Sequence, residues 1–263
     1  QWFMYDKNEV VQAQGSLKWR TLLEKVIKQN AFVIFFQPVV EQGTNKIVHH
    51  EVLTKMRDAK GELVNARIFM PMVRKCGFTE QVDLLIVEQV CRLLSHEKQQ
   101  TSCSLNLSVE SLLSSAFMDA FIQTLNKYPT VSNQIMVEIS EYYLVNHLTQ
   151  LTPILIQLAK HGVNVLADKV GQYVVNAQYL KECALTSLKL HRSVVLNIQH
   201  KTENQIVVQS ITTLCQPLNI KVYALGVETQ EEWAMLEKLG VHGGQGHYFN
   251  QPVEQVVSAI SVH

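Results

Sequence analysis

The stretch that decides the fold covers residues 134–168 and reads QIMVEISEYYLVNHLTQLTPILIQLAKHGVNVLAD. Both of its ends are short runs rich in Val, Ile and Leu, which is the composition of strands covered on both faces. Between them, residues 148–160 have the length and the apolar spacing of an amphipathic helix. The stretch therefore predicts a strand, a helix and a second strand in succession.

The same alternation continues on both sides of this stretch. Two apolar runs near the N-terminus follow each other closely enough to pair as a hairpin, and the remainder alternates between strand and helix. We expect strands at 32–40, 46–55, 101–108, 134–140, 162–168, 186–191, 220–227 and 244–249, and helices at 66–94, 112–126, 148–160, 176–181, 203–215 and 230–238. Eight strands in this arrangement are typical of an α/β protein with a (β/α)8 barrel. A doubly wound open sheet is the alternative, but no GxGxxG or GxxxxGK[ST] motif follows any expected strand.

The first fourteen residues differ from the rest. Residues 2–5 (WFMY) are typical of the last strand of a preceding domain, and a polar connector follows them. Gly15 and Ser16 then introduce a helical pattern, with Ser16 as the expected N-cap. Because the sequence begins with Gln1, we interpret it as part of a longer protein, with a linker at 1–14 and one domain at 15–263.

Composition excludes several classes of protein. The 47% of hydrophobic residues can fill a core, so a disordered chain is excluded. The 23 Lys and Arg balance 23 Asp and Glu, which argues against holding nucleic acid by bulk electrostatics. No apolar run approaches ~18 residues, so no membrane span is expected. The five cysteines form no CxxC pair, which favours buried free thiols in a reducing cytoplasm.

In a barrel, functional residues lie at the carboxyl ends of the strands. The expected strand ends carry Glu51, Asn106, Glu138 with Glu141, Asp168, Lys189 and Gln245. The oxygen-bearing side chains of Glu51, Asn106, Glu138 and Asp168 would suit a hard cation such as Mg²⁺. A single polar residue at a strand end more often caps a loop, so the prediction rests on the set.

These residues lie in segments that resemble the EAL domain family in order and spacing over residues 15–254. The segments are Gln37-Pro38, Glu51-Val52-Leu53, Asn106-Leu107-Ser108, Glu138-Ile139-Ser140-Glu141, Leu188-Lys189, Gly226-Val227-Glu228-Thr229 and Gly244-Gln245-Gly246. The resemblance implies a modified, TIM-like (β/α)8 barrel with one antiparallel strand. Active members of this family linearise cyclic di-GMP with two Mg²⁺ or Mn²⁺ ions, which is the activity that the resemblance brings into question here.

Three departures from the family pattern argue against that activity. After Asp168 the family has a second metal-binding Asp, and this sequence has Lys169. The family's general-base Glu is Leu225, and a further Asp is His191. A general base alone is worth ~10²–10⁴ in rate, and Glu228 stands three residues too far along to replace it. The alternative for Lys169 is that its long side chain turns to solvent, but a ligand is then still missing.

The resemblance therefore implies an inactive phosphodiesterase that requires no cofactor. Lys189 and Gln245 would be remnants of the catalytic set, and the four oxygen ligands would allow at most a single Mg²⁺. Gln37 and Lys55 are the candidate ligand-binding residues. Lys55 stands where the family has a phosphate-binding Arg, and it keeps the charge but loses the bidentate geometry. A cyclic di-GMP receptor without turnover and a residual phosphodiesterase are the alternatives.

Further segments are similar to one group within the family, the CsrD group with its vibrio-type MshH members. They include His49-His50-Glu51, Met70-Pro71-Met72-Val73 and Leu188-Lys189-Leu190-His191. The similarity implies the cytoplasmic part of an inner-membrane protein that follows a degenerate GGDEF domain. It implies a regulator that promotes RNase E decay of Csr small RNAs and is contacted by unphosphorylated glucose-specific enzyme IIA. A homodimer through the helices of 66–94 is a family-level expectation, and direct nucleic-acid binding is not expected.

Overall fold

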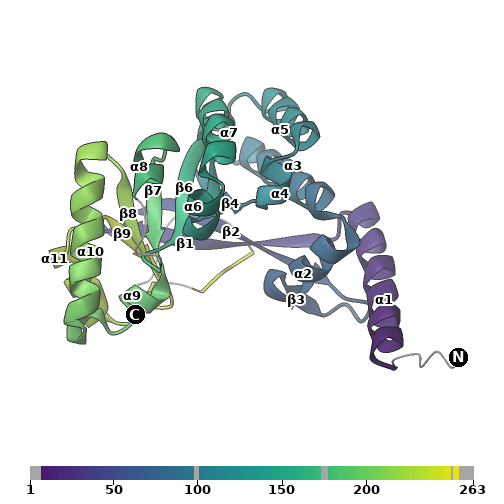
Figure 1. Ribbon diagram of the computed structural model, residues 1–263, viewed down its shortest axis with the longest axis horizontal. Coiled ribbons are helices and arrows are strands. Elements are labelled where there is room, and N and C mark those ends of the chain that lie inside the picture. Colours follow the sequence, from purple (N-terminus) through teal and green to yellow (C-terminus); the bar gives the residue numbers. More distant parts are fainter. Residues whose placement is uncertain (1–6, 98–100, 173–176, 250, 255–263) are drawn as a thin grey trace, which may run out of the picture.

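The computed structural model describes residues 7–97, 101–172, 177–249 and 251–254, with residues 7–16 described by their backbone alone. Eight strands close into a barrel in the order β1-β9-β8-β7-β6-β5-β4-β2, and β2 pairs again with β1 (Figure 1). Their bounds are β1 Phe32–Glu41, β2 Ile47–Arg57, β4 Cys103–Asn106, β5 Ile135–Ser140, β6 Asn164–Val170, β7 Ser187–Leu190, β8 Lys221–Leu225 and β9 Gly243–Gln245. All eight correspond to expected strands, so the closed barrel is confirmed and the open sheet is excluded.

One strand, β1, runs antiparallel to both of its neighbours, β2 and β9. From β2 through β4 and onward to β9 every pairing is parallel. The antiparallel strand that the family resemblance implies is therefore present. A further strand that the sequence did not predict, β3 (Leu63–Asn65), extends the sheet beyond β2. With three residues it is too short to show any periodicity.

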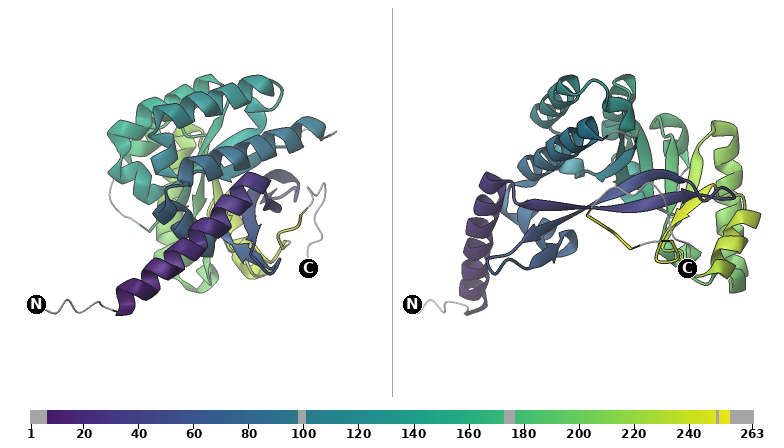
Figure 2. Two further views of the ribbon diagram at one scale, coloured as in Figure 1. Left: turned by 90° about the vertical axis from the view of Figure 1, so that its right-hand side faces the viewer. Right: turned by 180° about the vertical axis from the view of Figure 1, so that it is seen from behind.

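Helices cover the outside of the barrel (Figures 1 and 2). The longer ones are α1 Lys7–Gln29, α2 Ala66–Cys76, α3 Thr79–His96, α5 Ser115–Lys127, α7 Leu148–Lys160, α10 Thr202–Cys215 and α11 Gln230–Lys238. The shorter ones are α4 Val109–Leu112, α6 Glu141–Asn146, α8 Gln178–Glu182 and α9 Arg192–Val195. Within the described part of the chain, none of these helices has the length and apolarity to cross a membrane.

One expectation about a helix end was wrong. The helix expected to begin at Gly15 and Ser16 already begins at Lys7, because the preceding Glu, Val, Gln and Ala residues are compatible with a helix. Ser16 is therefore interior and not an N-cap, whereas the segment 2–5 lies outside the described residues. The stretch 66–94 forms two helices, because Gly77 takes the left-handed conformation with φ 76° and ends α2.

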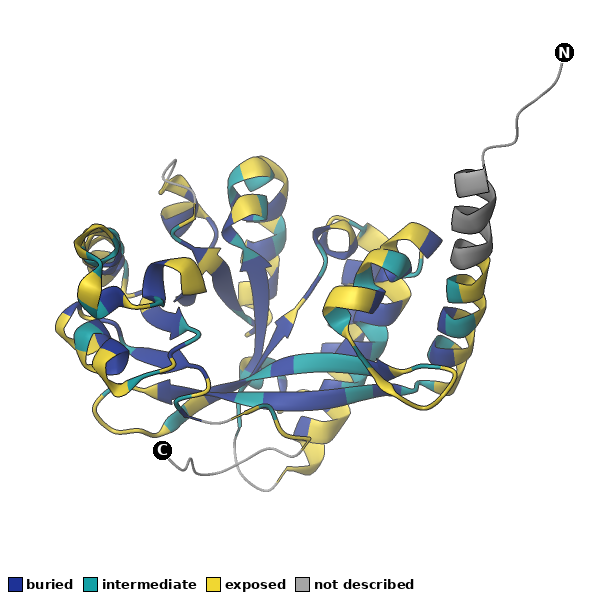
Figure 3. Cartoon of the chain, turned by 90° about the horizontal axis from the view of Figure 1, so that it is seen from below, coloured by how far each residue is buried: buried dark blue, intermediate teal, exposed yellow. Residues whose placement is uncertain are grey.

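The core follows the barrel wall and the inner faces of the helices, while the outer helix faces are exposed (Figure 3). Strand β5 is buried along five of its six residues, as expected for a strand covered on both faces. All five cysteines are buried free thiols, as expected. The parallel strands β4 to β9 therefore present their carboxyl ends at one mouth of a packed barrel.

Candidate functional site

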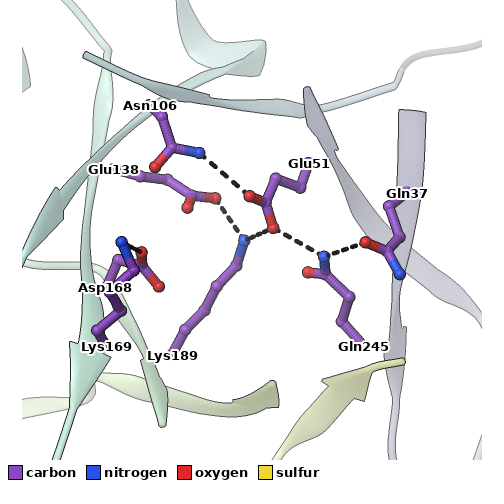
Figure 4. A network of polar contacts seen from close by, with 8 residues as sticks. All are labelled: Gln37, Glu51, Asn106, Glu138, Asp168, Lys169, Lys189 and Gln245. Atoms are coloured by element: carbon purple, nitrogen blue, oxygen red, sulfur yellow. Dashed lines mark hydrogen bonds and ion pairs between the residues drawn. The ribbon is translucent and has the colours of Figure 1, made fainter. Parts of the chain in front are cut away.

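Lys189 on β7 is at the centre of the barrel mouth (Figure 4). Its side chain is fully buried, and its Nζ donates to Glu51 Oε2 at 2.9 Å and to Glu138 Oε1 at 2.5 Å. One ammonium group thus joins β2, β5 and β7 across the interior of the barrel.

Glu51 extends this network toward β1, β4 and β9. Its Oε1 accepts from Asn106 Nδ2 at 3.1 Å, and its Oε2 accepts from Gln245 Nε2 at 2.7 Å. The same Gln245 amide donates to Gln37 Oε1 at 2.9 Å. The sequence predicted functional side chains at these strand ends, and the structure brings Gln37, Glu51, Asn106, Glu138, Lys189 and Gln245 into one hydrogen-bonded network.

Strand register explains the convergence. Gln37 is paired with Glu51, Asn106 with Glu138, and Leu225 with Gln245. Paired residues on neighbouring strands point to the same face of a sheet, so these side chains all face the interior. The antiparallel strand β1 adds Gln37, because the middle of β1 pairs with the middle of β2 at Glu51.

Burial and charge set the protonation states. Burial works to raise the pKa of Glu51, but Lys189 and the donated hydrogen bonds outweigh it and lower that pKa. Burial and the nearby Glu51 raise the pKa of Glu138 to about 7, and burial also raises the pKa of Asp168. Burial opposes the charge of Lys189, but Glu138 and Glu51 raise its pKa and keep it protonated.

Lys169 lies at a distortion of β6. The pairing of β6 with β7 shifts between Ala167 and Val170, and Lys169 has the left-handed φ of 59°. Its side chain is 54% exposed, and its Nζ lies 3.7 Å from Asp168 Oδ2. The side chain thus turns toward solvent, which was the alternative expectation, yet its charge stays beside Asp168.

The remaining altered positions, Leu225 and His191, place no carboxylate at the mouth. Leu225 is paired with Gln245 and points to the interior, where a hydrocarbon side chain cannot accept a proton. Glu228 forms an ion pair with Arg192 instead of reaching inward. His191 caps α9, with its Nδ1 accepting from the Ser193 amide, and burial lowers its pKa.

The four predicted metal ligands do not form a ready cation site. Glu138 Oε2 and Asp168 Oδ1 are buried without a hydrogen-bond partner, so single oxygens could accept a cation. However, no three His, Cys, Asp or Glu side chains among the described residues are arranged to hold a metal ion. The Lys189 ammonium already contacts Glu51 and Glu138, and Asn106 presents its amide nitrogen to Glu51. Lys189 thus occupies Glu51 Oε2 and Glu138 Oε1, while Glu138 Oε2 and Asp168 Oδ1 stay without a partner.

Two further predicted residues lie away from the network. Lys55 on β2 is half-buried, with its Nζ 3.9 Å from the centre of the Phe35 ring, so its charge faces an aromatic surface. Glu141 is buried, and it accepts from Tyr179 Oη at 2.8 Å and from the Gly171 amide at 3.1 Å. Glu141 therefore ties together two points of the chain on either side of residues 173–176.

The partners of these residues could not be predicted. Tyr179 lies 38 positions from Glu141, and Arg192 lies 36 positions from Glu228. The one hint in the sequence concerned Arg192, which directly follows the segment 188–191 that carries part of the family resemblance. The fold decides such long-range pairs.

Comparison with known proteins gives consistent matches. A family model described as EAL domain matches residues 19–252. The RNase E specificity factor CsrD of Escherichia coli K12 is 30% identical over 263 residues, which is 99% of this chain and 40% of that protein. The bifunctional diguanylate cyclase/cyclic di-GMP phosphodiesterase MucR of Pseudomonas aeruginosa is 24% identical over 255 residues, which is 95% of this chain and 37% of that protein. This chain thus spans about two fifths of these curated relatives.

Solved structures show the same fold. The EAL domain of FimX from Pseudomonas aeruginosa, bound to c-di-GMP, matches with a TM-score of 0.86 at 21% identity, over 92% of this chain and 99% of that one. The EAL enzyme Bd1971, in a form bound to cAMP and cyclic-di-GMP, matches with a TM-score of 0.82 at 24% identity, over 92% and 67% of the two chains.

Proposed function

The chain belongs to the EAL domain family, and from that premise we propose that it is a catalytically inactive regulatory barrel that acts by binding a protein partner. The observation that carries this proposal is Leu225, which stands at the interior mouth where a general base would be needed. Loss of a general base lowers the rate of hydrolysis by a factor of ~10²–10⁴. Glu228 does not replace it, because that carboxylate forms an ion pair with Arg192.

The charges at the mouth support the same proposal. Lys169 replaces a carboxylate beside Asp168, and Lys189 neutralises Glu51 and Glu138 directly. Two-metal hydrolysis needs paired cations that hold the attacking and leaving oxygens. The Lys169 ammonium beside Asp168 works against binding such a pair.

The similarity to CsrD supports a regulatory role in RNA decay. We propose that the chain belongs to the cytoplasmic part of an inner-membrane protein that promotes RNase E turnover of Csr small RNAs. Unphosphorylated glucose-specific enzyme IIA is the proposed protein partner, and a homodimer is the proposed assembly.

Calorimetry and product analysis test whether the barrel is inactive. The chain is titrated with cyclic di-GMP in the presence of Mg²⁺ and then Mn²⁺, and each sample is analysed for the linear dinucleotide. We expect neither heat nor product. Linear product from the purified chain would overturn the proposal.

A second candidate function is a cyclic di-GMP receptor without turnover. The amide side chains of Gln37, Asn106 and Gln245 at the mouth favour it, since they could bind the polar edges of a nucleotide. Heat of binding without product would establish this function. Q37A should then weaken the binding, whereas the exposed Q209A on α10 should leave it unchanged.

Enzyme IIA binding has its own test. The purified chain is immobilised and exposed to unphosphorylated and phosphorylated glucose-specific enzyme IIA in parallel. We expect retention of the unphosphorylated form alone. Equal retention of both forms, or of neither, would contradict the proposed partner without bearing on the missing base.

A further inference from the structure

The zero net charge of the chain conceals a strong separation of charge. Residues 17–29 of α1 and residues 55–78, which include the β2–β3 hairpin and α2, lie together at one end of the molecule (Figure 2). We name these two segments the basic lobe. It carries ten Lys and Arg against three Asp and Glu, whereas the rest of the chain carries thirteen against twenty.

The basic lobe contains an apolar groove. The groove has a volume of about 570 Å³ and lies between α1 and the tip of the β2–β3 hairpin. It is lined by Leu17, Lys18, Trp19, Thr21, Leu22, Lys25 and Ala59. Within the described residues, its lining contains two lysines and no carboxylate, so hydrocarbon walls are combined with positive charge.

Most of this positive charge has no ion-pair partner in the described part of the chain. Arg20 pairs with Glu24, and Arg74 pairs with Glu110. Among the residues that the structure describes, Lys18, Lys25 and Lys60 have no acidic partner within ion-pair distance. All three are exposed, so their charges are available to a partner.

Large aliphatic side chains are exposed on the same lobe. Leu17 is 65% exposed, Ile68 58% and Leu63 38%. The aromatic rings of the lobe are less exposed than these aliphatic side chains. Trp19 is half-buried, and the Phe78 ring lies 5.2 Å from the guanidinium of Arg20.

We propose that the basic lobe binds the surface of an anionic phospholipid bilayer. Lysines at a bilayer surface direct their ammonium groups to anionic headgroups, while leucines and their own stems enter the interface. Lys18, Lys25 and Leu17 at the groove provide this combination. Single-stranded RNA fits less well, because its binding sites usually stack bases on exposed aromatic faces. The proposal does not depend on what happens at the barrel mouth.

Vesicle sedimentation with the full 263-residue chain tests the proposal. The probes are vesicles of phosphatidylcholine alone and vesicles of phosphatidylcholine and phosphatidylglycerol in equal parts. We expect binding to the mixed vesicles that weakens as salt is added, and no binding to phosphatidylcholine. Failure to bind the mixed vesicles at low salt, or equal binding to both kinds, would overturn the proposal.

A matched pair of variants locates the surface. The triple variant K18E/K25E/K60E should bind the mixed vesicles about tenfold more weakly or worse. The control K160E/K181E/K238E makes the same change in net charge at exposed lysines outside the lobe, and it should bind like the wild type. Circular dichroism confirms that each variant is folded. Equal losses in both variants would contradict a localised surface.

The apolar contribution and the competing ligand are tested separately. L17S should weaken vesicle binding a few-fold without changing the fold, because Leu17 is mostly exposed. A short single-stranded RNA is offered to the same samples in a filter-binding assay. RNA binding that is lost in K18E/K25E/K60E, together with absent vesicle binding, would assign the lobe to nucleic acid and overturn the lipid proposal.

Discussion

At the residue scale, Lys189 provides the positive charge that holds three strands together at the mouth. Its ammonium is buried between Glu51 and Glu138, so K189M would leave two buried carboxylates facing each other. Removing one partner of a buried ion pair costs about 3–5 kcal/mol. We expect a loss of this size in the free energy of unfolding, measured by urea denaturation.

The same variant tests whether Lys189 occupies the place of a cation. In K189M the freed carboxylates can bind Mn²⁺, so Mn²⁺ should raise the unfolding midpoint of the variant. The wild type, in which Lys189 contacts Glu51 and Glu138, should respond much less. An equal shift in both proteins would mean that the ammonium does not exclude the metal.

A second residue-scale prediction concerns the missing base. L225E restores a carboxyl at the mouth but leaves Lys169 beside Asp168, so we expect no linear dinucleotide from it. L225E/K169D restores both groups, and we expect slow turnover of cyclic di-GMP with Mn²⁺. L225Q/K169D is the matched control, because Gln has a similar shape but cannot act as a base. Turnover by L225E alone would show that Lys169 is not an obstacle.

Glu138 should make the stability depend on pH. Burial and the nearby Glu51 raise its pKa from 4.5 to about 7 in the folded state. A carboxyl whose pKa is raised in the folded state stabilises the fold fully below pH 4.5, its ordinary pKa. This contribution disappears as the pH rises to the folded-state pKa of about 7. Between about pH 5 and pH 8 the wild type should therefore lose roughly 1–3 kcal/mol relative to E138Q.

Urea denaturation of both proteins across this range measures the difference. Burial lowers the pKa of His49, which acts on stability in the opposite direction, but this effect is common to both proteins and cancels. E62Q, at an exposed position, should show the wild-type pH dependence. A constant difference between the wild type and E138Q would contradict the raised pKa of Glu138.

At the scale of secondary structure elements, the start of α11 shows how a short motif holds a loop. Thr229 caps the helix by accepting from the Glu232 amide, and Glu232 Oε2 accepts from the Thr229 and Glu228 amides. The other oxygen of Glu232 accepts from the Asn197 amide at 2.7 Å. The carboxylate thus joins α11 to the loop that follows α9.

We therefore expect T229A to lower the free energy of unfolding by about 1 kcal/mol, as is usual for the loss of an N-cap. E232A should cost more, about 2–3 kcal/mol, because it leaves three backbone amides without their acceptor. E231A, at a neighbouring exposed position, serves as the control. If E232A were no more damaging than T229A in thermal unfolding, the link to Asn197 would carry no stability.

The elements also show what sequence could and could not predict. The strands were predictable because long apolar runs such as 134–140 belong in a covered sheet, and the carboxyl ends of parallel strands meet at one mouth. The division of residues 66–94 into α2 and α3 depends on the single Gly77. The early start of α1 depends on the weak helix propensities of the residues before Gly15. The bulge at Lys169 arises from the pairing of β6 with β7, which no local pattern encodes. The ion pairs of Lys189 likewise depend on register across three strands.

At the scale of the whole molecule, the barrel closes through a narrow seam. Strand β1 pairs with β2 along most of its length, but it pairs with β9 only at Val40 and Glu41. Beyond β9 the chain returns to β1, where Phe36 and Val253 exchange two backbone hydrogen bonds of 2.7 and 3.0 Å. The described C-terminal segment thus completes the edge of β1 that β9 leaves unpaired.

This seam gives the last prediction. A chain ending at residue 249 lacks the bridge and exposes the Phe36 amide, so it should unfold at a lower temperature, and that amide should exchange hydrogen faster. A chain ending at residue 254 keeps Val253 and should behave like the full chain. V253P removes one of the two hydrogen bonds, so its unfolding temperature should lie between those of the two shortened chains. If the chain ending at 249 were as stable as the one ending at 254, the two pairs between β1 and β9 would suffice to close the barrel.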